Sequence, residues 1–339
     1  MEQLQDYALV VGINKYANGD FLETLYGPCN DANNFVKWLF SEPGGQLPKE
    51  HVTPFTLLSD DVGQKPKTGD VIEAIKSLLA LAPPEKPIGR RLYIFMAGHG
   101  VGPDLDDTGL LTAEATEDAP SYIEGRRYAN LFRGRGVFEE IVLMMDCCRD
   151  YDGTLPAPVF PFKPRLVPGI KPPKYFYAYA TGFGRDSREK EIDAQVSGIF
   201  SHAVIAGLNG GAVDGDGRIT GQSLERFIIK TVKTLLPAGV NQLPEIRTDS
   251  EMVFAEGFKP RTGVVRIAAT IPHAGVLILL GVGFQAVAAE ITTVQPNVYE
   301  VNLPIGKVYV FQLVDAAGAI LKQTGQTLDD AEGVVDVKL

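Results

Sequence analysis

The sequence predicts an α/β fold, in which a mostly parallel sheet carries helices on both faces, followed by a small antiparallel β-sandwich. Up to about residue 255, apolar runs alternate with stretches of helical periodicity, which is typical of βαβ units. From residue 264 onward the runs are short and alternating, with Gly, Pro and Asn between them, which is typical of antiparallel strands. We therefore expect two domains, residues 1–258 and 264–339.

Five strands are expected in the first domain, because a strand covered on both faces is a nearly continuous apolar run. Pro54 lacks a backbone N–H and places one of these runs at a sheet edge. The predicted strands are residues 7–13, 52–58, 91–97, 141–145 and 175–181.

Helices are expected between these strands wherever apolar residues recur at helical spacing. The pair Ser121 and Glu124 has the spacing of a capping box and predicts a helix that ends near Phe132. The other predicted helices are residues 30–40, 70–81, 200–208 and 221–236.

Seven short strands are expected in the second domain, after a linker at residues 256–263. Seven strands in so short a stretch predict an antiparallel sandwich. The predicted strands are residues 264–270, 276–280, 285–292, 298–303, 307–314, 319–323 and 334–339.

Composition excludes several classes of protein. The formal net charge is −10, which argues against non-specific binding to nucleic acid or to an anionic membrane. Three cysteines in 339 residues exclude a disulfide scaffold and favour a reducing compartment. The start of the chain has no basic leader, and the most apolar stretch, residues 274–284, is short of the ~20 residues that span a bilayer. We expect a soluble, cytoplasmic protein.

Two predicted strands are followed by residues that can do chemistry. His99 lies in the segment AGHG after one strand, and Cys148 lies in DCCR after another. Either residue alone is more often structural. The carboxyl ends of parallel strands meet at one edge of the sheet, however, so the two side chains can form a nucleophile with its proton-transfer partner. No third member of a triad is visible.

Five segments together resemble the caspase/metacaspase family of cysteine peptidases, including its bacterial members. The resemblance covers about residues 6–255 and does not extend to the second domain. Its motifs are ALVVGINKY (8–16), CNDANNFVKWL (29–39), YIFMAGHG (93–100), LMMDCCRD (143–150) and GIFSHAVIAGLNGGAVDGDGRIT (198–220).

The resemblance implies a role for several residues of these motifs. Cys148 would be the nucleophile, because the family uses the cysteine two residues after the Asp, and Cys147 would be a packing residue. His99 would be the general acid/base that protonates the leaving amine. The backbone N–H groups of Gly100 and Cys148 would form the oxyanion hole.

In metacaspases an acidic S1 pocket selects the P1 residue, and the matching residues here are Asp31 and Asp146. Asp146 and Cys148 are two residues apart, so strand alternation also tends to direct their side chains to the same side. Two carboxylates beside the nucleophile favour a P1 Arg or Lys. The alternative is that Asp31 caps the helix that begins there.

No metal ligand is assigned, although metacaspases often need calcium. The acidic loop 104–118 does not match the family's calcium site closely enough to transfer ligands, and a solvated loop is the simpler interpretation. Residues 212–220 resemble an EF-hand loop but lack its first acid and its bidentate Glu, so we expect a turn.

A proline-rich loop is expected at residues 150–174, because its prolines exclude a regular helix or central strand. In the family this position is a specificity and activation loop, sometimes cut by the enzyme itself. The alternative is a static surface loop. Basic residues that could be cut there are Lys163, Arg165, Lys171 and Lys174, of which Lys163 and Lys171 precede Pro.

The predicted function is that of a cysteine endopeptidase acting on proteins or peptides after Arg or Lys, with an activating protease or regulatory partner possible. The family's bacterial members also suggest a defence or cell-death pathway. Two alternatives stay open, a catalytically silent scaffold and a Cys–His peptidase of another P1 specificity. The second domain adds no visible chemistry and is expected to be an inhibitory or docking module.

Overall fold

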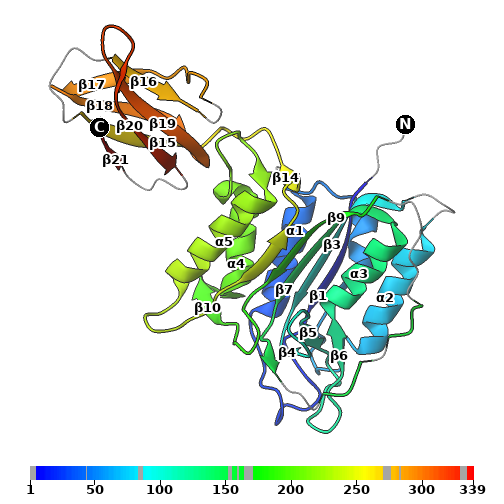
Figure 1. Cartoon of the computed structure of the whole chain (residues 1–339). Helices are drawn as coiled ribbons and strands as arrows, with labels where there is room; N and C mark the ends of the chain where they lie inside the picture. Colours follow the sequence, from blue (N-terminus) through cyan, green and yellow to red (C-terminus); the bar gives the residue numbers. More distant parts are fainter. Residues whose placement is uncertain are drawn as a thin grey trace. The chain divides into compact units, whose positions relative to one another are not determined.

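A computed structural model describes residues 5–42, 44–82, 87–151, 155–158, 160–163, 171–269, 276–281, 284–328 and 334–339 (Figure 1). The chain divides into two compact units. Unit 1 comprises residues 1–212 and 224–252, and unit 2 comprises residues 213–223 and 253–339. Residues 213–223, which the sequence analysis assigns to the first domain, thus group with the second unit. No helix in the described part of the chain is long and apolar enough to cross a membrane.

A six-stranded sheet forms the centre of unit 1, in the order β13-β9-β7-β3-β1-β2. All neighbouring pairs are parallel except β13 with β9. The expected mostly parallel α/β sheet is therefore confirmed. The strands are β1 (Tyr7–Gly12), β2 (Thr56–Leu58), β3 (Gly89–Ala97), β7 (Phe138–Asp146), β9 (Lys174–Tyr179) and β13 (Glu245–Thr248).

Strand β2 is shorter than the apolar run 52–58 predicts. Two 3₁₀ turns, Lys49–His51 and Thr53–Phe55, precede it. Pro54 sits in the first turn of the second, where its fixed φ is tolerated. The predicted edge position is confirmed.

Helices cover both faces of this sheet (Figure 1). On one face Val71 and Phe132, from α2 and α3, join Leu9 and Leu143 in one hydrophobic cluster. On the other face Phe35 of α1 stacks on Phe95 of β3 with ring centroids 4.8 Å apart. The helices are α1 (Pro28–Phe40), α2 (Thr68–Ala80), α3 (Gly125–Arg135), α4 (Ile199–Ala206), which continues as a π-type turn over Gly207–Gly211, and α5 (Gly221–Leu235).

The capping box predicted at Ser121 and Glu124 is wrong. Residues Tyr122–Glu124 form strand β6, and α3 begins only at Gly125. Strand β6 is held in a second, four-stranded sheet of order β6-β5-β4-β8, so its pairing overrides the local helix signal. The other strands of that sheet are β4 (Gly100–Gly102), β5 (Gly109–Leu111) and β8 (Asp150–Tyr151).

Two further sheets have two strands each. Strands β10 (Glu189–Ile192) and β11 (Gln195–Gly198) form an antiparallel hairpin in unit 1. Strands β12 (Ile219–Thr220) and β14 (Val253–Ala255) pair antiparallel in unit 2.

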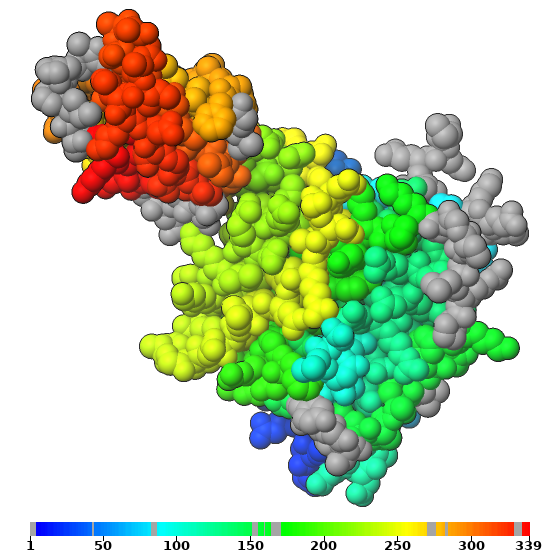
Figure 2. Space-filling model, in the orientation of Figure 1, coloured from blue at the N-terminus to red at the C-terminus, as the bar shows by residue number. Residues whose placement is uncertain are grey.

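Residues 237–241, between α5 and β13, are exposed, and Figure 2 shows this yellow-green segment at the surface.

Two sheets pack around one core in unit 2, which gives the expected sandwich. Their orders are β17-β18-β15-β21 and β16-β19-β20. The sandwich is not wholly antiparallel, because β15 and β21 pair in parallel. The turn expected at residues 212–220 is confirmed, with Asp214 accepting the Asp216 and Arg218 N–H groups. The strands are β15 (Thr262–Ala268), β16 (Val276–Leu280), β17 (Ile291–Gln295), β18 (Val298–Pro304), β19 (Lys307–Val314), β20 (Ile320–Leu328) and β21 (Val334–Lys338).

Candidate active site

The register of two parallel strands brings His99 and Cys148 to the same edge of the sheet. Ala97 of β3 pairs with Asp146 of β7, and each of the two candidate residues lies two positions further along its chain. The Gly98 N–H donates to the Asp146 carbonyl at 3.1 Å, which holds the two strand ends together. No hydrogen bond joins the His99 and Cys148 side chains in the described part of the chain. Such bonds are often long in the absence of substrate.

A backbone carbonyl orients the His99 ring. His99 Nε2 lies 2.8 Å from the Glu23 carbonyl oxygen. A carbonyl only accepts, so this contact requires the proton on Nε2 and leaves Nδ1 free to accept one. The buried Tyr16 hydroxyl accepts the His99 backbone N–H at 2.8 Å, and the two rings lie 5.1 Å apart. The sequence does not predict the role of Glu23, because the contact is made by its backbone carbonyl, a group that every residue has.

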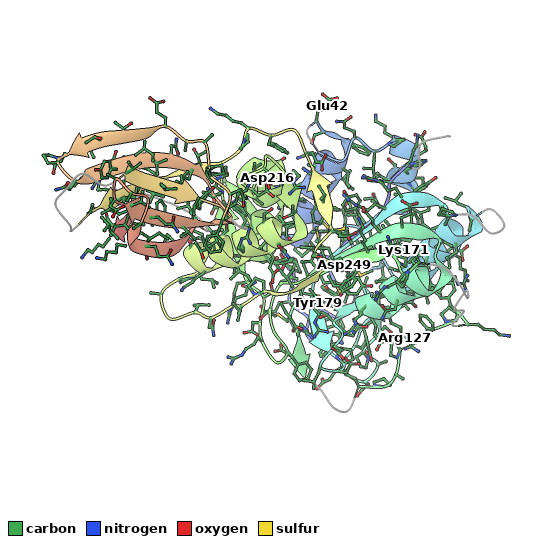
Figure 3. The ribbon with its side chains drawn as sticks, turned by 45° about the horizontal axis from the view of Figure 1, so that its top comes forward. Glu42, Arg127, Lys171, Tyr179, Asp216 and Asp249 are labelled. Carbon is green, nitrogen blue, oxygen red and sulfur yellow. The ribbon has the colours of Figure 1, made fainter. Side chains whose placement is uncertain are left out.

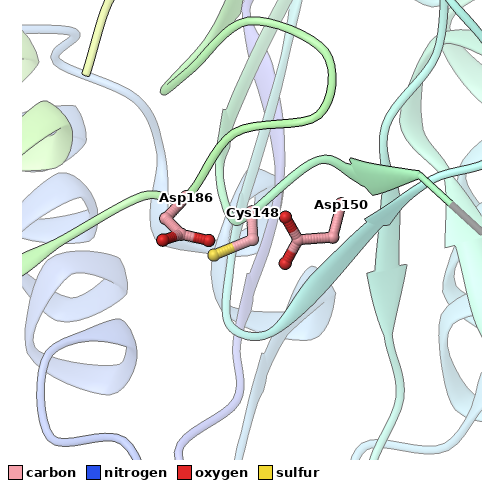
Figure 4. A group of neighbouring side chains, drawn as sticks. All are labelled: Cys148, Asp150 and Asp186. Carbon is pink, nitrogen blue, oxygen red and sulfur yellow. The ribbon is translucent and has the colours of Figure 1, made fainter. Parts of the chain in front are cut away.

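The Cys148 thiol is half-buried and lies among acidic groups. Its Sγ accepts the Ser187 N–H at 3.2 Å. The ligand atoms of Cys148, Asp150 and Asp186 all lie within 4.8 Å of one another (Figure 4). Burial, assisted by these two carboxylates and opposed by the Ser187 N–H, raises the pKa of Cys148 to about 11. The resting thiol is therefore protonated at neutral pH. Cys147 points into the hydrophobic core of unit 1.

The backbone of Cys148 lies close to Gly100. The Cys148 N–H has no hydrogen-bond partner among the residues that the structure describes. Gly100 packs so closely that a Cβ there would lie 2.5 Å from the Cys148 carbonyl oxygen. The Leu111 N–H donates to the His99 carbonyl, a register that leaves the Gly100 N–H outside the β4–β5 ladder.

Asp31 and Asp146 converge next to Gly198. One oxygen of each carboxylate lies within 3.2 Å of the position that a Cβ would take on Gly198. Asp146 accepts the Ser187 hydroxyl at 2.6 Å and both the N–H and the hydroxyl of Ser201, at 2.9 and 2.7 Å. Asp31 accepts the Ser197 hydroxyl, and the Gly198 N–H at 2.9 Å. The explanation of Asp31 as a helix cap is wrong, because its carboxylate bonds to β11 and not to its own helix.

No cation compensates the two carboxylates. Asp31 is 2% and Asp146 is 7% exposed, and neither forms an ion pair among the described residues. Burial and the neighbouring Asp146 charge raise the pKa of Asp31 to about 8. Burial also raises the pKa of Asp146, although the hydrogen bonds from Ser187 and Ser201 oppose it. Burial therefore disfavours the ionised form of both carboxyl groups.

Arg149 anchors the segment that follows Cys148, a role that sequence reasoning missed. Its side chain is fully buried and pairs with Glu245 at 2.7 Å. Its guanidinium carbon lies 4.9 Å from the centroid of the Tyr179 ring, a residue labelled in Figure 3. Its backbone N–H donates to the Arg185 carbonyl at 3.0 Å, and its carbonyl accepts the Gly184 N–H at 2.8 Å. These contacts fix the loop of Cys148 against the segment that contains Ser187.

In the acidic loop 104–118, Asp104 and Asp106 bond to protein groups within and outside the loop. Asp104 accepts the Asp106 and Asp107 N–H groups, each at 2.7 Å. Asp106 pairs with Arg126 and Arg247 at 2.8 and 2.9 Å. In the described chain, the single group of side chains spaced to hold a metal ion is Cys148, Asp150 and Asp186.

Much of the proline-rich loop 150–174 lies outside the described residues, including Arg165. Lys163 and Lys171 are described and have no regular structure. Lys174 begins strand β9 and lies 3.6 Å from a carboxylate oxygen of Glu251. A bond after Lys174 is therefore held within the sheet and not presented by a loop.

Comparison with known proteins agrees with this geometry. The family model of the caspase domain matches residues 5–250. The chain belongs to the caspase-domain family. The crystal structure of caspase-1 from Spodoptera frugiperda has a TM-score of 0.52 and 14% sequence identity to this chain, covering 76% of it and 91% of that chain. At this identity the likeness shows the caspase fold alone.

A bacterial relative of the caspase-domain chain is a curated protein from a Desulfuromonadales bacterium, described as a probable protease. The two are 27% identical over 225 residues, which is 61% of this chain and 26% of the relative. The chain thus spans about a quarter of the length of that relative. The resemblance to the caspase family of peptidases is confirmed.

Proposed function

We propose that this protein is a cysteine endopeptidase that cleaves after Arg or Lys, with Cys148 as nucleophile and His99 as general acid/base. One observation carries the proposal. Two buried carboxylates without a counter-cation converge beside a thiol that shares a sheet edge with a histidine. A cytoplasmic location, and a role in bacterial defence or cell death, stay predictions from the sequence.

The chemistry proceeds in two steps. His99 Nδ1 takes the Cys148 proton as the sulfur attacks the scissile carbonyl carbon, and the N–H groups of Gly100 and Cys148 stabilise the oxyanion. The C–N bond then breaks, and His99 returns the proton to the leaving amine. Water, deprotonated by His99, attacks the thioester carbonyl and releases the carboxylic acid and the thiol.

The P1 preference follows from charge. A guanidinium between Asp31 and Asp146 would supply the counter-charge that the pocket lacks, and its planar fork can bond two carboxylate oxygens. Lys fits the charge but not the bidentate geometry. An acidic P1 residue would bring a further carboxyl group into a desolvated site that already holds two, which is unfavourable.

The test replaces each candidate in turn and measures cleavage of a fluorogenic P1-Arg peptide, with and without calcium. Cys148→Ala should abolish turnover with the fold intact by circular dichroism, whereas Cys147→Ala should retain most of it, since only Cys148 borders the pocket. His99→Ala should lower kcat by ~10²–10⁴-fold. Reversed phenotypes for the two cysteines would overturn the assignment of the nucleophile.

One observation favours a catalytically silent scaffold as the second candidate. Burial and two nearby carboxylates disfavour the Cys148 thiolate, which an active thiol needs. The two functions differ in a simple measurement, because a scaffold would bind a P1-Arg peptide equally well in the wild type and in Cys148→Ala without cleaving it. A Cys–His peptidase of another P1 specificity would cleave peptides whose P1 residue is neither Arg nor Lys.

A further inference from the structure

One carboxylate of the β10–β11 hairpin binds the backbone just before helix α1. Glu189, the first residue of β10, accepts the Tyr26 N–H at 3.2 Å and the Gly27 N–H at 2.9 Å with its two oxygens. Across the hairpin, Glu189 pairs with Gly198, whose N–H donates to Asp31. A residue distant in sequence thus joins the start of α1 to the acidic pocket.

The segment that Glu189 holds also orients His99. The Glu23 carbonyl, which fixes the His99 ring, lies three residues before Tyr26. This segment is fixed at Leu25, whose N–H donates to the Asn14 carbonyl at 2.9 Å, and then by Glu189 at the next two residues. Two further bonds hold the same stretch, because the Leu22 N–H donates to the Asn18 carbonyl at 3.0 Å and the Asn30 side-chain amide donates to the Tyr26 carbonyl at 3.0 Å. Glu189 accepts the two backbone N–H groups that follow Leu25.

The same contacts set the position of Asp31. Gly27 is the N-cap residue of α1 and has no side chain to cap the helix. The Asn14 side-chain oxygen accepts the Cys29 N–H of the first turn at 2.8 Å. Glu189 accepts the N–H of Gly27 itself, at the end of the helix where the dipole favours a carboxylate. The Gly27 carbonyl accepts the Asp31 N–H at 2.9 Å, so the fixed start of the helix also fixes Asp31.

We infer that Glu189 is a positioning residue that holds the orienting carbonyl of His99 and the pocket residue Asp31 in register with each other. It acts through the backbone at residues 23–27 and touches neither substrate nor the reacting atoms. This inference rests on the proposed peptidase function. Its sequence context, an acid in a polar hairpin, gives no signal of this role.

The test compares Glu189→Ala and Glu189→Gln with Glu191→Ala in the full chain. Glu191 lies two residues along β10 and is exposed, and its side chain makes no hydrogen bond or ion pair with the described residues. Competent sites are counted with an irreversible P1-Arg inhibitor, so that kcat and KM refer to folded sites alone. Thermal melts of each variant are measured in parallel.

Glu189→Ala should lower kcat per competent site by about tenfold or more, since small misplacements of a catalytic group are costly, and should raise KM for the P1-Arg peptide. Glu189→Gln retains one acceptor oxygen for two N–H groups, so its kcat and KM per competent site should lie between those of Glu189→Ala and of the wild type. Glu191→Ala should match the wild type. A purely structural role would lower the melting temperature and the number of sites only. Unchanged kcat and KM per site in Glu189→Ala would overturn the inference.

A second readout separates this inference from the proposed specificity. The rate of Cys148 alkylation by iodoacetamide at pH 7.5 depends on His99 as base but not on a P1 residue. Glu189→Ala should react at least about threefold more slowly than the wild type. If the wild type cleaves no basic peptide, the proposed function fails, while equal alkylation rates in wild type and Glu189→Ala would still contradict the role of Glu189.

Discussion

The thiol of Cys148 has an unusually acidic setting for a nucleophile. Asp150 and Asp186 flank it, and burial has already raised its pKa to about 11. The thiolate is therefore scarce at neutral pH until His99 accepts the proton or a bound cation offsets the charge. Activation on substrate binding, and not a preformed ion pair, is the mode of catalysis that this arrangement favours.

Removal of either flanking charge should make the free thiol more reactive. In Asp186→Asn and in Asp150→Asn, one negative charge near the sulfur is lost, so the pKa of Cys148 should fall and its thiolate fraction at pH 7 should rise. We expect the rate of iodoacetamide alkylation to increase roughly 3–10-fold. Asp193→Asn, at the exposed hairpin turn, is the control. A slower reaction in both variants would show that these carboxylates activate the thiol.

The acidic pocket should bind cations more tightly as pH rises. The pKa of Asp31 is raised to about 8, so Asp31 is mostly protonated at pH 6.5 and mostly ionised at pH 8.5. Affinity for agmatine, measured by calorimetry on Cys148→Ala, should increase roughly tenfold between these values. In Asp31→Asn this pH dependence should disappear. Affinity that falls with pH, or stays constant in the Asp31-containing protein, would contradict the proposed protonation.

At the scale of residues, sequence predicts the groups that have distinctive chemistry but not their partners. His99 and Cys148 follow two apolar strands, and the parallel register does bring these positions to one edge. Glu23 and Ser187 contribute backbone atoms, which carry no signature of residue type. The positions of these backbone atoms depend on the conformations of loops, which the sequence does not predict.

Helix α3 shows how an element can begin without a local cap. Its first three N–H groups are satisfied by two residues of a distant loop. The Gly125 N–H donates to the Thr108 carbonyl at 3.0 Å, and Asp107 accepts the Arg126 and Arg127 N–H groups at 2.8 and 2.9 Å. A capping acceptor supplied from another segment cannot be recognised by spacing, which is why the Ser121 signal misleads.

Asp107→Ala should therefore destabilise the protein far more than Ser121→Ala. Asp107 is buried and accepts three backbone N–H groups, which its removal would leave unpaired. We expect a loss of about 1–3 kcal/mol in the free energy of unfolding, measured by urea titration. Ser121→Ala should change it by less than about 0.5 kcal/mol. Equal effects would mean that the helix start is set by Ser121 after all.

At the scale of the whole molecule, the sequence predicts the order of strands and helices well, because apolar runs mark the central sheet and short alternating runs mark the sandwich. It does not predict that residues 213–223 group with unit 2. In unit 2 the Gly217 carbonyl accepts the Phe258 N–H at 3.0 Å, and Asp216 pairs with Lys307 at 2.6 Å. These long-range contacts leave no mark in local periodicity.

Loss of core packing in unit 2 should leave peptide cleavage intact. Phe311 is fully buried in the core of unit 2, and every residue proposed to act in catalysis lies in unit 1. Phe311→Ala should cost about 3–5 kcal/mol in unit 2 and appear as an early thermal transition. Cleavage of a short peptide at 25 °C should stay within about twofold of the wild type. A large loss of activity would mean that unit 2 contributes to the site.

A Cys–His site that selects a basic P1 residue is tested most directly by a panel of fluorogenic peptides that differ only at P1. Wild-type protein should cleave peptides with Arg or Lys at P1, and kcat/KM for neutral and acidic P1 residues should be lower by ~10²-fold or more, as expected when a buried charge lacks its partner. Cys148→Ala should cleave none of them. Preferred cleavage after Asp or a neutral residue would contradict the acidic pocket, and cleavage by Cys148→Ala would contradict the nucleophile.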